Sequence, residues 1–188
     1  MSRFGYTSLG FGSGSDAPFE NAYSVAGDGV DDFVGNFTSG MITTMEAINT
    51  LPVTISAWFN LDTSPGDYPV IIYFGGIAAD TSSMDYMGLQ WVNGTTTFRA
   101  IGRAGPEDTV ILNSSASVST GSWNHVAFTR SGTTGILYVN GTSDTSTDGE
   151  WGVDLGNYTG SAAGLSVGAL QGAVLSLAGK VDEVAIFD

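Results

Sequence analysis

The chain of 188 residues contains no cysteine. This absence excludes disulfide bonds, thiolate catalysis and zinc sites built on cysteine. Long apolar runs are absent as well. None approaches the length of about 18 residues that a membrane-spanning helix needs, so we expect no such helix. The first residues, 1–6, hold no continuous apolar segment of the kind found in signal peptides, so we expect no signal peptide.

Positive charge is scarce. Five Lys and Arg residues stand against 19 Asp and Glu, which gives a formal net charge of −14. No basic patch can be built from so few cations, so nucleic acid and anionic membranes are unsuitable partners. Carboxylates suit cations, and Ca²⁺ prefers oxygen ligands. The alternative is that these acids only keep the protein soluble.

The length predicts one domain, preceded by an N-terminal arm. We place the arm at residues 1–21 and the domain at 22–188. The arm is rich in Gly and Ser, which indicates flexibility, yet it also contains aromatic residues such as Phe4 and Phe19. Two interpretations are open: the arm folds back on its own domain, or it docks on a neighbouring subunit.

Short strands and turns dominate the pattern. Glycine is abundant, with 27 residues, and apolar and polar residues alternate over 53–59, which predicts a half-buried strand. The Asn93-Gly94 pair predicts a hairpin turn between two further strands. The one predicted helical turn covers 41–49. This pattern of many short strands predicts an all-β fold, an antiparallel two-sheet β-sandwich.

Three segments carry a family resemblance. The first is 27–34, GDGVDDFV, with 54–59, TISAWF, about twenty residues later. The second is 123–130, WNHVAFTR, which runs into 137–141, LYVNG. The third is 179–187, GKVDEVAIF. In this order and spacing they resemble the laminin-G-like, concanavalin A-like jelly-roll modules, from about residue 22 to the C-terminus.

The resemblance implies a two-sheet jelly roll in which the first and last strands are neighbours. It also implies, for many members, a Ca²⁺ site near those strands. Members of the family serve as carbohydrate-binding modules, adhesion domains, appendages of secreted enzymes, and structural or receptor-contacting parts of bacteriophage virions. The fold therefore leaves the function open.

Four acids form the predicted metal site. Strict alternation in the last strand places Asp182 on the same face as the apolar Val184 and Ile186, which would turn its carboxylate toward the core. A carboxylate in that place needs a partner. If the first and last strands pair, Asp182 would meet the turn acids, and together they would bind a structural Ca²⁺. In the alternative, the turn acids are solvated and Asp182 caps backbone amides. The four predicted ligands are Asp28, Asp31, Asp32 and Asp182.

A predicted ligand-binding group consists of Trp91, Trp151 and Asp148. Trp91 adjoins the predicted hairpin turn, and Trp151 follows an acidic, hydroxyl-rich loop that contains Asp148. A tryptophan in such a place can stack on a sugar, or it can be an ordinary core residue. We expect His125, the one histidine, to be structural.

We expect no enzymatic activity, because no strand presents two carboxylates spaced two residues apart. Asp182 and Glu183 are adjacent and would face opposite ways. The predicted function is a non-enzymatic bacteriophage virion module, a capsid decoration or a tail or fibre component. Its arm would contact other virion proteins or a second copy, and it could contact cell-surface glycans. The alternative is a carbohydrate-binding or adhesion domain of a secreted bacterial protein, with an extracellular location.

Overall fold

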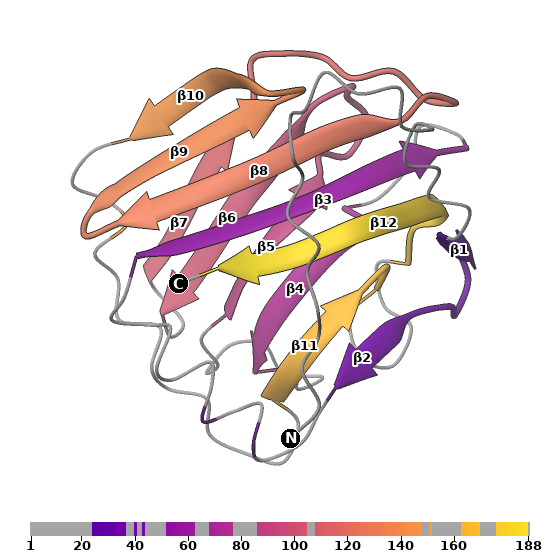
Figure 1. Cartoon of the computed structure of the whole chain (residues 1–188), viewed down its shortest axis with the longest axis horizontal. Coiled ribbons are helices and arrows are strands. Elements are labelled where there is room, and N and C mark those ends of the chain that lie inside the picture. The colour runs from indigo at the N-terminus through magenta and orange to yellow at the C-terminus, as the bar shows by residue number, and fades with distance from the viewer. Residues whose placement is uncertain are drawn as a thin grey trace, which may run out of the picture.

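Two antiparallel sheets of six strands each pack face to face in the computed structural model (Figure 1). This confirms the predicted β-sandwich of the jelly-roll type. The predicted arm, 1–21, lies outside the described residues, so its boundary with the domain stays a prediction. The described residues are 24–36, 40, 43, 52–62, 68–76, 86–104, 108–147, 151, 163–169 and 176–187.

The first sheet, sheet A, has the strand order β1-β12-β3-β8-β9-β10. Its strands are β1 (Val25–Asp28), β12 (Ala178–Phe187), β3 (Val53–Leu61), β8 (Asn124–Ser131), β9 (Thr134–Val139) and β10 (Thr142–Thr147). The second sheet, sheet B, has the order β2-β11-β4-β5-β6-β7. Its strands are β2 (Val34–Asn36), β11 (Ala163–Val167), β4 (Val70–Gly76), β5 (Tyr86–Trp91), β6 (Phe98–Ala104) and β7 (Asp108–Asn113).

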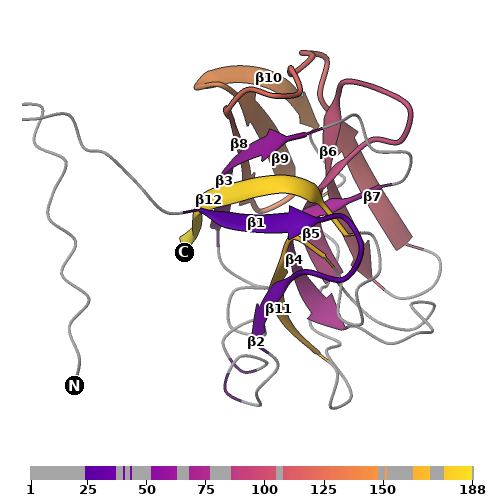
Figure 2. The ribbon, with the colours of Figure 1, turned by 90° about the vertical axis from the view of Figure 1, so that its right-hand side faces the viewer.

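The first and last strands are neighbours, as the resemblance implied. β1 pairs antiparallel with β12, and the chain then passes from sheet A to β2 at the edge of sheet B (Figure 2). Gly29 begins this crossing with a φ of 83°, a conformation that glycine adopts without strain. Asp28 ends β1, and Asp31 and Asp32 therefore lie in the connection between the two sheets.

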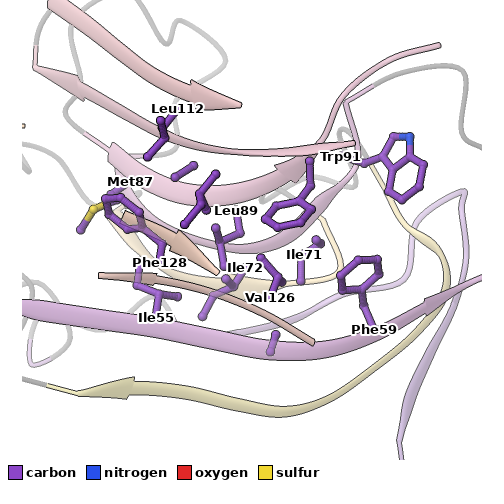
Figure 3. Close-up of a cluster of buried hydrophobic side chains, with 14 of the residues drawn as sticks. Ile55, Phe59, Ile71, Ile72, Met87, Leu89, Trp91, Leu112, Val126 and Phe128 are labelled. Atoms are coloured by element: carbon purple, nitrogen blue, oxygen red, sulfur yellow. The ribbon is translucent and has the colours of Figure 1, made fainter. Parts of the chain in front are cut away.

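The core lies between the sheets and is built from the apolar residues that occupy every second position of the strands. In β3 the residues Val53, Ile55, Ala57, Phe59 and Leu61 are all buried, and the residues between them are more exposed. They meet the inward residues of sheet B, among them the large aromatic groups that Figure 3 shows. This layer separates the two outward sheet faces, and on sheet B the outward Tyr73 and Gln90 are themselves nearly buried.

Alternation fails at one place, inside β12. Asp182 lies opposite Trp58, but the next registered pair is Ala185 with Ser56, so two residues of β12 face the single Ala57. This is a β-bulge, and Glu183 within it has a φ of 45°. The extra residue shifts every later side chain to the other face.

The predicted inward orientation of Asp182 is therefore wrong. Directly opposed residues of neighbouring strands share a face, and Trp58 is 37% exposed on the outer face of sheet A. Val181 faces the core opposite Phe59, and Ile186 faces it opposite Ile55, on the two sides of the bulge. Asp182 thus points outward although Ile186 points inward.

Two other predictions can be compared directly. The hairpin at Asn93-Gly94 is confirmed, since β5 and β6 pair on either side of it and the Val92 amide donates to the Thr97 carbonyl. In the predicted helical turn 41–49 only Thr43 is described, and it is helical. Within the described ranges no helix is long and apolar enough to span a bilayer.

Candidate functional site: the outer face of sheet B

The predicted calcium ligands are not gathered in one place. Asp28 lies opposite Ala178, four residues along β12 from Asp182, which corresponds to about 13 Å of strand. Within the described part of the chain, no three His, Asp or Glu side chains lie close enough to hold a metal ion. The described residues thus do not bring the four acids into one group, and the calcium site stays a prediction.

These acids instead bind backbone amides. The Asp28 carboxylate accepts a hydrogen bond from the Val30 amide at 2.7 Å, and the Asp32 carboxylate accepts one from the Asp28 amide at 3.2 Å. Asp182 accepts one from the Glu183 amide at 2.7 Å, inside the bulge. Asp31 lies exposed in the same turn as Asp28. This geometry agrees with the alternative interpretation, in which Asp28, Asp31 and Asp32 are acids of a turn and Asp182 caps a backbone amide.

The two predicted ligand-binding tryptophans lie in the core. Trp91 is 0% exposed, and its indole N–H donates to the Thr95 carbonyl at 3.1 Å. Trp151 is 1% exposed and packs on Phe128 with a centroid distance of 4.4 Å. Neither ring offers a face to a sugar in this structure. Asp148 lies outside the described residues.

His125 stands on the outer face of sheet A. Its ring lies 5.2 Å from the Trp58 ring, and its backbone amide donates to the Asn140 side chain at 2.8 Å. Burial lowers the pKa of His125 below its ordinary value, while the negative charge of Glu183 acts in the opposite direction. These contacts fit the structural role that we expected.

A different group of side chains lies on the outer face of sheet B, and sequence reasoning missed it. Met87, Leu89, Phe98 and Ala100 belong to the core, so the residues that alternate with them point outward. We call this group the tyrosine–arginine face. It consists of Tyr73 on β4, Tyr86 and Gln90 on β5, Arg99 and Arg103 on β6, and Tyr68 just before β4.

Arg99 is the most closely held group of this face. It lies directly opposite Gln90, and its Nε and Nη2 atoms donate to the Gln90 Oε1 atom at 3.1 and 2.9 Å. Its guanidinium carbon lies 4.2 Å from the centre of the Tyr68 ring, a cation–π contact. Burial lowers the pKa of Arg99 from its ordinary value, while Tyr68 and Tyr86 raise it. The guanidinium is thus fixed in place and partly withdrawn from water, yet still charged.

Two tyrosines lie next to this arginine. The ring centroids of Tyr73 and Tyr86 are 5.1 Å apart, and the rings are tilted by 31° to each other. Gly88, opposite Tyr73, makes room for this pair: a Cβ atom there would lie 3.3 Å from the Tyr73 ring and 2.7 Å from the Ile72 carbonyl oxygen. Tyr73 is buried, and Tyr86 is partly exposed beside Arg103.

The described strand positions of this face carry positive charge, whereas the whole protein is strongly negative. Two of the five Lys and Arg residues, Arg99 and Arg103, occupy outward positions of β6. None of the outward positions of β4, β5, β6 and β7 within the described residues is an Asp or Glu. A forked donor, an amide and aromatic rings on one sheet face can bind polar ligands that also have apolar surfaces.

A family profile matches most of the chain. The family is described as the Concanavalin A-like lectin/glucanases superfamily, and the match covers residues 35–188. No curated protein sequence matches the chain.

Solved structures share the fold at low identity. The CBM40 module of the Ruminococcus gnavus IT-sialidase is similar with a TM-score of 0.65 and 15% identity, over 87% of this chain and 90% of that chain. The NanB sialidase of Streptococcus pneumoniae is similar with a TM-score of 0.66 and 15% identity, over 87% of this chain and 25% of that chain.

A third structure contains a sugar. Domain 4 of AbnA, an extracellular arabinanase of Geobacillus stearothermophilus, was solved in complex with arabinotriose. Its TM-score is 0.54 at 20% identity, over 72% of this chain, and the match spans 60% of that chain. At these identities the three likenesses establish the fold, and function has to be argued from the site.

Proposed function

We propose that this chain, which belongs to the concanavalin A-like lectin/glucanase superfamily, is a carbohydrate-binding module that holds its glycan on the tyrosine–arginine face. The observation that carries this proposal is Arg99, fixed between the Tyr68 ring and the Gln90 amide on an outward sheet face. Such a guanidinium is ready to donate to hydroxyl or carboxylate oxygens with little loss of side-chain entropy.

The aromatic groups of this face suit the apolar C–H surface of a sugar. A pyranose or furanose ring has C–H faces that pack on aromatic rings, and its hydroxyls need hydrogen-bond partners. Tyr86 is partly exposed on this face and supplies both a ring and a phenolic hydroxyl. The sialidase and arabinanase domains that share the fold support a glycan ligand.

The proposed role is binding without catalysis. Glycoside hydrolysis by the common mechanisms uses two carboxylic acids that flank the scissile bond. The described outward positions of β4–β7 carry no carboxylate, so this face has no acid–base pair to offer. We therefore propose a module that targets or adheres to a glycan, rather than one that cleaves it.

An extracellular location suits this role better than the virion that we predicted first. The similar structures include an extracellular arabinanase domain and a sialidase module. The virion placement, and contacts of the arm with virion proteins or a second copy, stay predictions. A glycan on a cell surface is a partner in both cases.

A glycan array with the purified chain tests the proposal. Binding to a defined set of glycans is expected, and Tyr86→Ala should weaken it by roughly tenfold or more, the effect of losing a central aromatic contact. Trp58→Ala is the matched control, because Trp58 is an exposed aromatic residue on the opposite sheet. Absence of binding to any glycan, or equal loss in both variants, would contradict the proposal.

A further inference from the structure

Among the described residues, Arg99 contacts neutral groups alone, although the protein is strongly acidic. Its described contacts are the Gln90 amide oxygen and the Tyr68 ring, and no described Asp or Glu pairs with it. The chain contains 19 acidic residues, so a carboxylate partner for this arginine would have been easy to supply. The neutral surroundings of Arg99 therefore need an explanation.

Holding a bare guanidinium in this way costs free energy. The side chain is partly withdrawn from water, and the Gln90 that fixes it is only 4% exposed. Charged groups that lose water are ordinarily compensated by an opposite charge. A side chain that served stability alone would be better replaced by an apolar residue or paired with an acid. The missing charge is most simply supplied by a ligand.

The free edge of Arg99 has the shape for such a ligand. A guanidinium carries five N–H donors, and Nε and Nη2 each give one to Gln90. The remaining donors lie on Nη1 and Nη2, whose shared edge matches the two oxygens of a carboxylate. Tyr68 covers one face of the guanidinium, so its plane is already set before a ligand arrives.

A second cation extends the positive region. Arg103 occupies the next but one outward position of β6, about 13 Å along the strand from Arg99, and lies opposite Tyr86. Both arginines share a face whose described strand positions carry no acid. The described strand positions of this face therefore carry cations and no acid, which favours an anionic ligand.

We infer that the glycan bound by the tyrosine–arginine face is an acidic one, and that Arg99 binds its carboxylate through the Nη1–Nη2 edge. This inference rests on the proposed carbohydrate-binding function and adds the class of sugar: a uronic acid or another sugar acid. The partly exposed ring of Tyr86 would pack on the sugar ring next to the carboxylate.

The experiment uses pairs of ligands that differ only in charge. Oligogalacturonate and oligoglucuronate are each compared with their methyl esters by isothermal titration calorimetry, and sialyllactose is compared with lactose. We expect the intact chain to bind at least one acid roughly 10- to 100-fold more tightly than its neutral partner, the range for a charge-assisted bidentate contact. The affinity for the acid should fall as salt is added.

Variants then test the assignment to Arg99. Arg99→Gln should remove the preference for the acid. Arg99→Lys should keep only part of it, because the lysine ammonium cannot make the two parallel hydrogen bonds of a guanidinium. Lys180→Gln is the matched control, since it removes one exposed positive charge from sheet A. Thermal unfolding of each variant shows whether the fold is kept.

The outcomes are distinguishable. Equal affinity for the acids and their neutral partners would overturn the acidic ligand and leave the glycan-binding function standing. Binding of neither form, together with an empty glycan array, would overturn both. A preference for the acid that survives Arg99→Gln would overturn the role of Arg99. If Lys180→Gln also loses the preference for the acid, that preference depends on net charge alone, and the role of Arg99 is overturned.

Discussion

Trp151 joins the two sheets by filling the space above two glycines. A Cβ atom on Gly102 of sheet B would lie 2.8 Å from the Trp151 ring, and one on Gly135 of sheet A would lie 2.5 Å from it. The indole also packs on Phe128, and the Trp151 backbone amide donates to the Thr133 carbonyl at 3.0 Å. The ring is therefore a wedge that touches both layers of the sandwich.

Removing the wedge should destabilise the protein strongly. Trp151→Ala deletes a side chain that is 1% exposed, and such deletions cost about 3–5 kcal/mol. For a chain of this size that corresponds to a fall in Tm on the order of 10 °C. Trp151→Phe should cost less, because it keeps a ring and removes an indole N–H that is buried without a hydrogen-bond partner. Trp123→Ala is the control, since Trp123 is 42% exposed.

A double-mutant cycle isolates the wedge. Gly135→Ala alone should cost about 1–3 kcal/mol by overpacking, but much less in the Trp151→Ala background, where the nearest ring atoms are gone. Urea unfolding followed by circular dichroism gives the four free energies of unfolding. If the two substitutions add without coupling, or if Trp151→Ala unfolds like Trp123→Ala, the ring does not fill this space and the reasoning fails.

Three further predictions concern sheet A and the calcium site. Glu183→Gly should be more stable than Glu183→Val by about 1–2 kcal/mol in free energy of unfolding, because a φ of 45° disfavours side chains and β-branched ones most; equal free energies would contradict the bulge geometry. The folded-state pKa of His125 is lowered, so the unfolded state binds the proton more readily and stability falls as pH drops through about 6.5. The stability advantage of the wild type over His125→Gln should therefore shrink between about pH 7.5 and 5.5, and a constant difference would refute this. Because Asp182 points away from the core and lies four strand positions from the partner of Asp28, CaCl₂ and EDTA should give the same Tm; a calcium-dependent rise that Asp182→Asn abolishes would instead establish the predicted site.

The strand pattern could be predicted from the sequence because alternation depends only on which residues prefer water. In β3 the predicted inward residues Val53, Ile55, Ala57 and Phe59 are all buried. The pairing of the first and last strands came from the family resemblance, and the structure confirms it. These features are local or periodic, so a single sequence can reveal them.

The orientation of Asp182 could not be predicted in the same way. A bulge adds one residue to a strand without changing its composition, and alternation counted across it assigns the wrong face. The segment from Asp182 to Ala185 contains no glycine or proline that would mark the irregularity. The bulge is stabilised by a hydrogen bond from the Glu183 amide to the Asp182 side chain, and such a contact becomes visible only with the backbone in place.

The tyrosine–arginine face escaped prediction for a different reason. Tryptophan is the natural candidate for sugar stacking, and the predicted ligand-binding group therefore rests on Trp91 and Trp151. The signal that was overlooked is the scarcity of cations: two of the five lie at alternate outward positions of one hairpin, as Arg99 and Arg103. Combining the predicted hairpin with the alternation of β6 would have placed both arginines on one face, opposite Gln90 and Tyr86.

Glycine within the strands makes room for large aromatic rings on both faces of sheet B. The abundance of glycine indicated turns, yet Gly102 and Gly135 lie at inward strand positions and leave space for Trp151. Gly88 does the same on the outward side of sheet B, where the Tyr73 ring lies against the strand. A glycine is a costly choice inside a strand because it weakens the strand without contributing packing. Three such positions, each beside a large ring, therefore indicate that the sandwich is built around these aromatic groups. Replacing Gly88 with alanine would displace Tyr73 and disturb the face beside Tyr86, while leaving the wedge on the other side of the sheet in place.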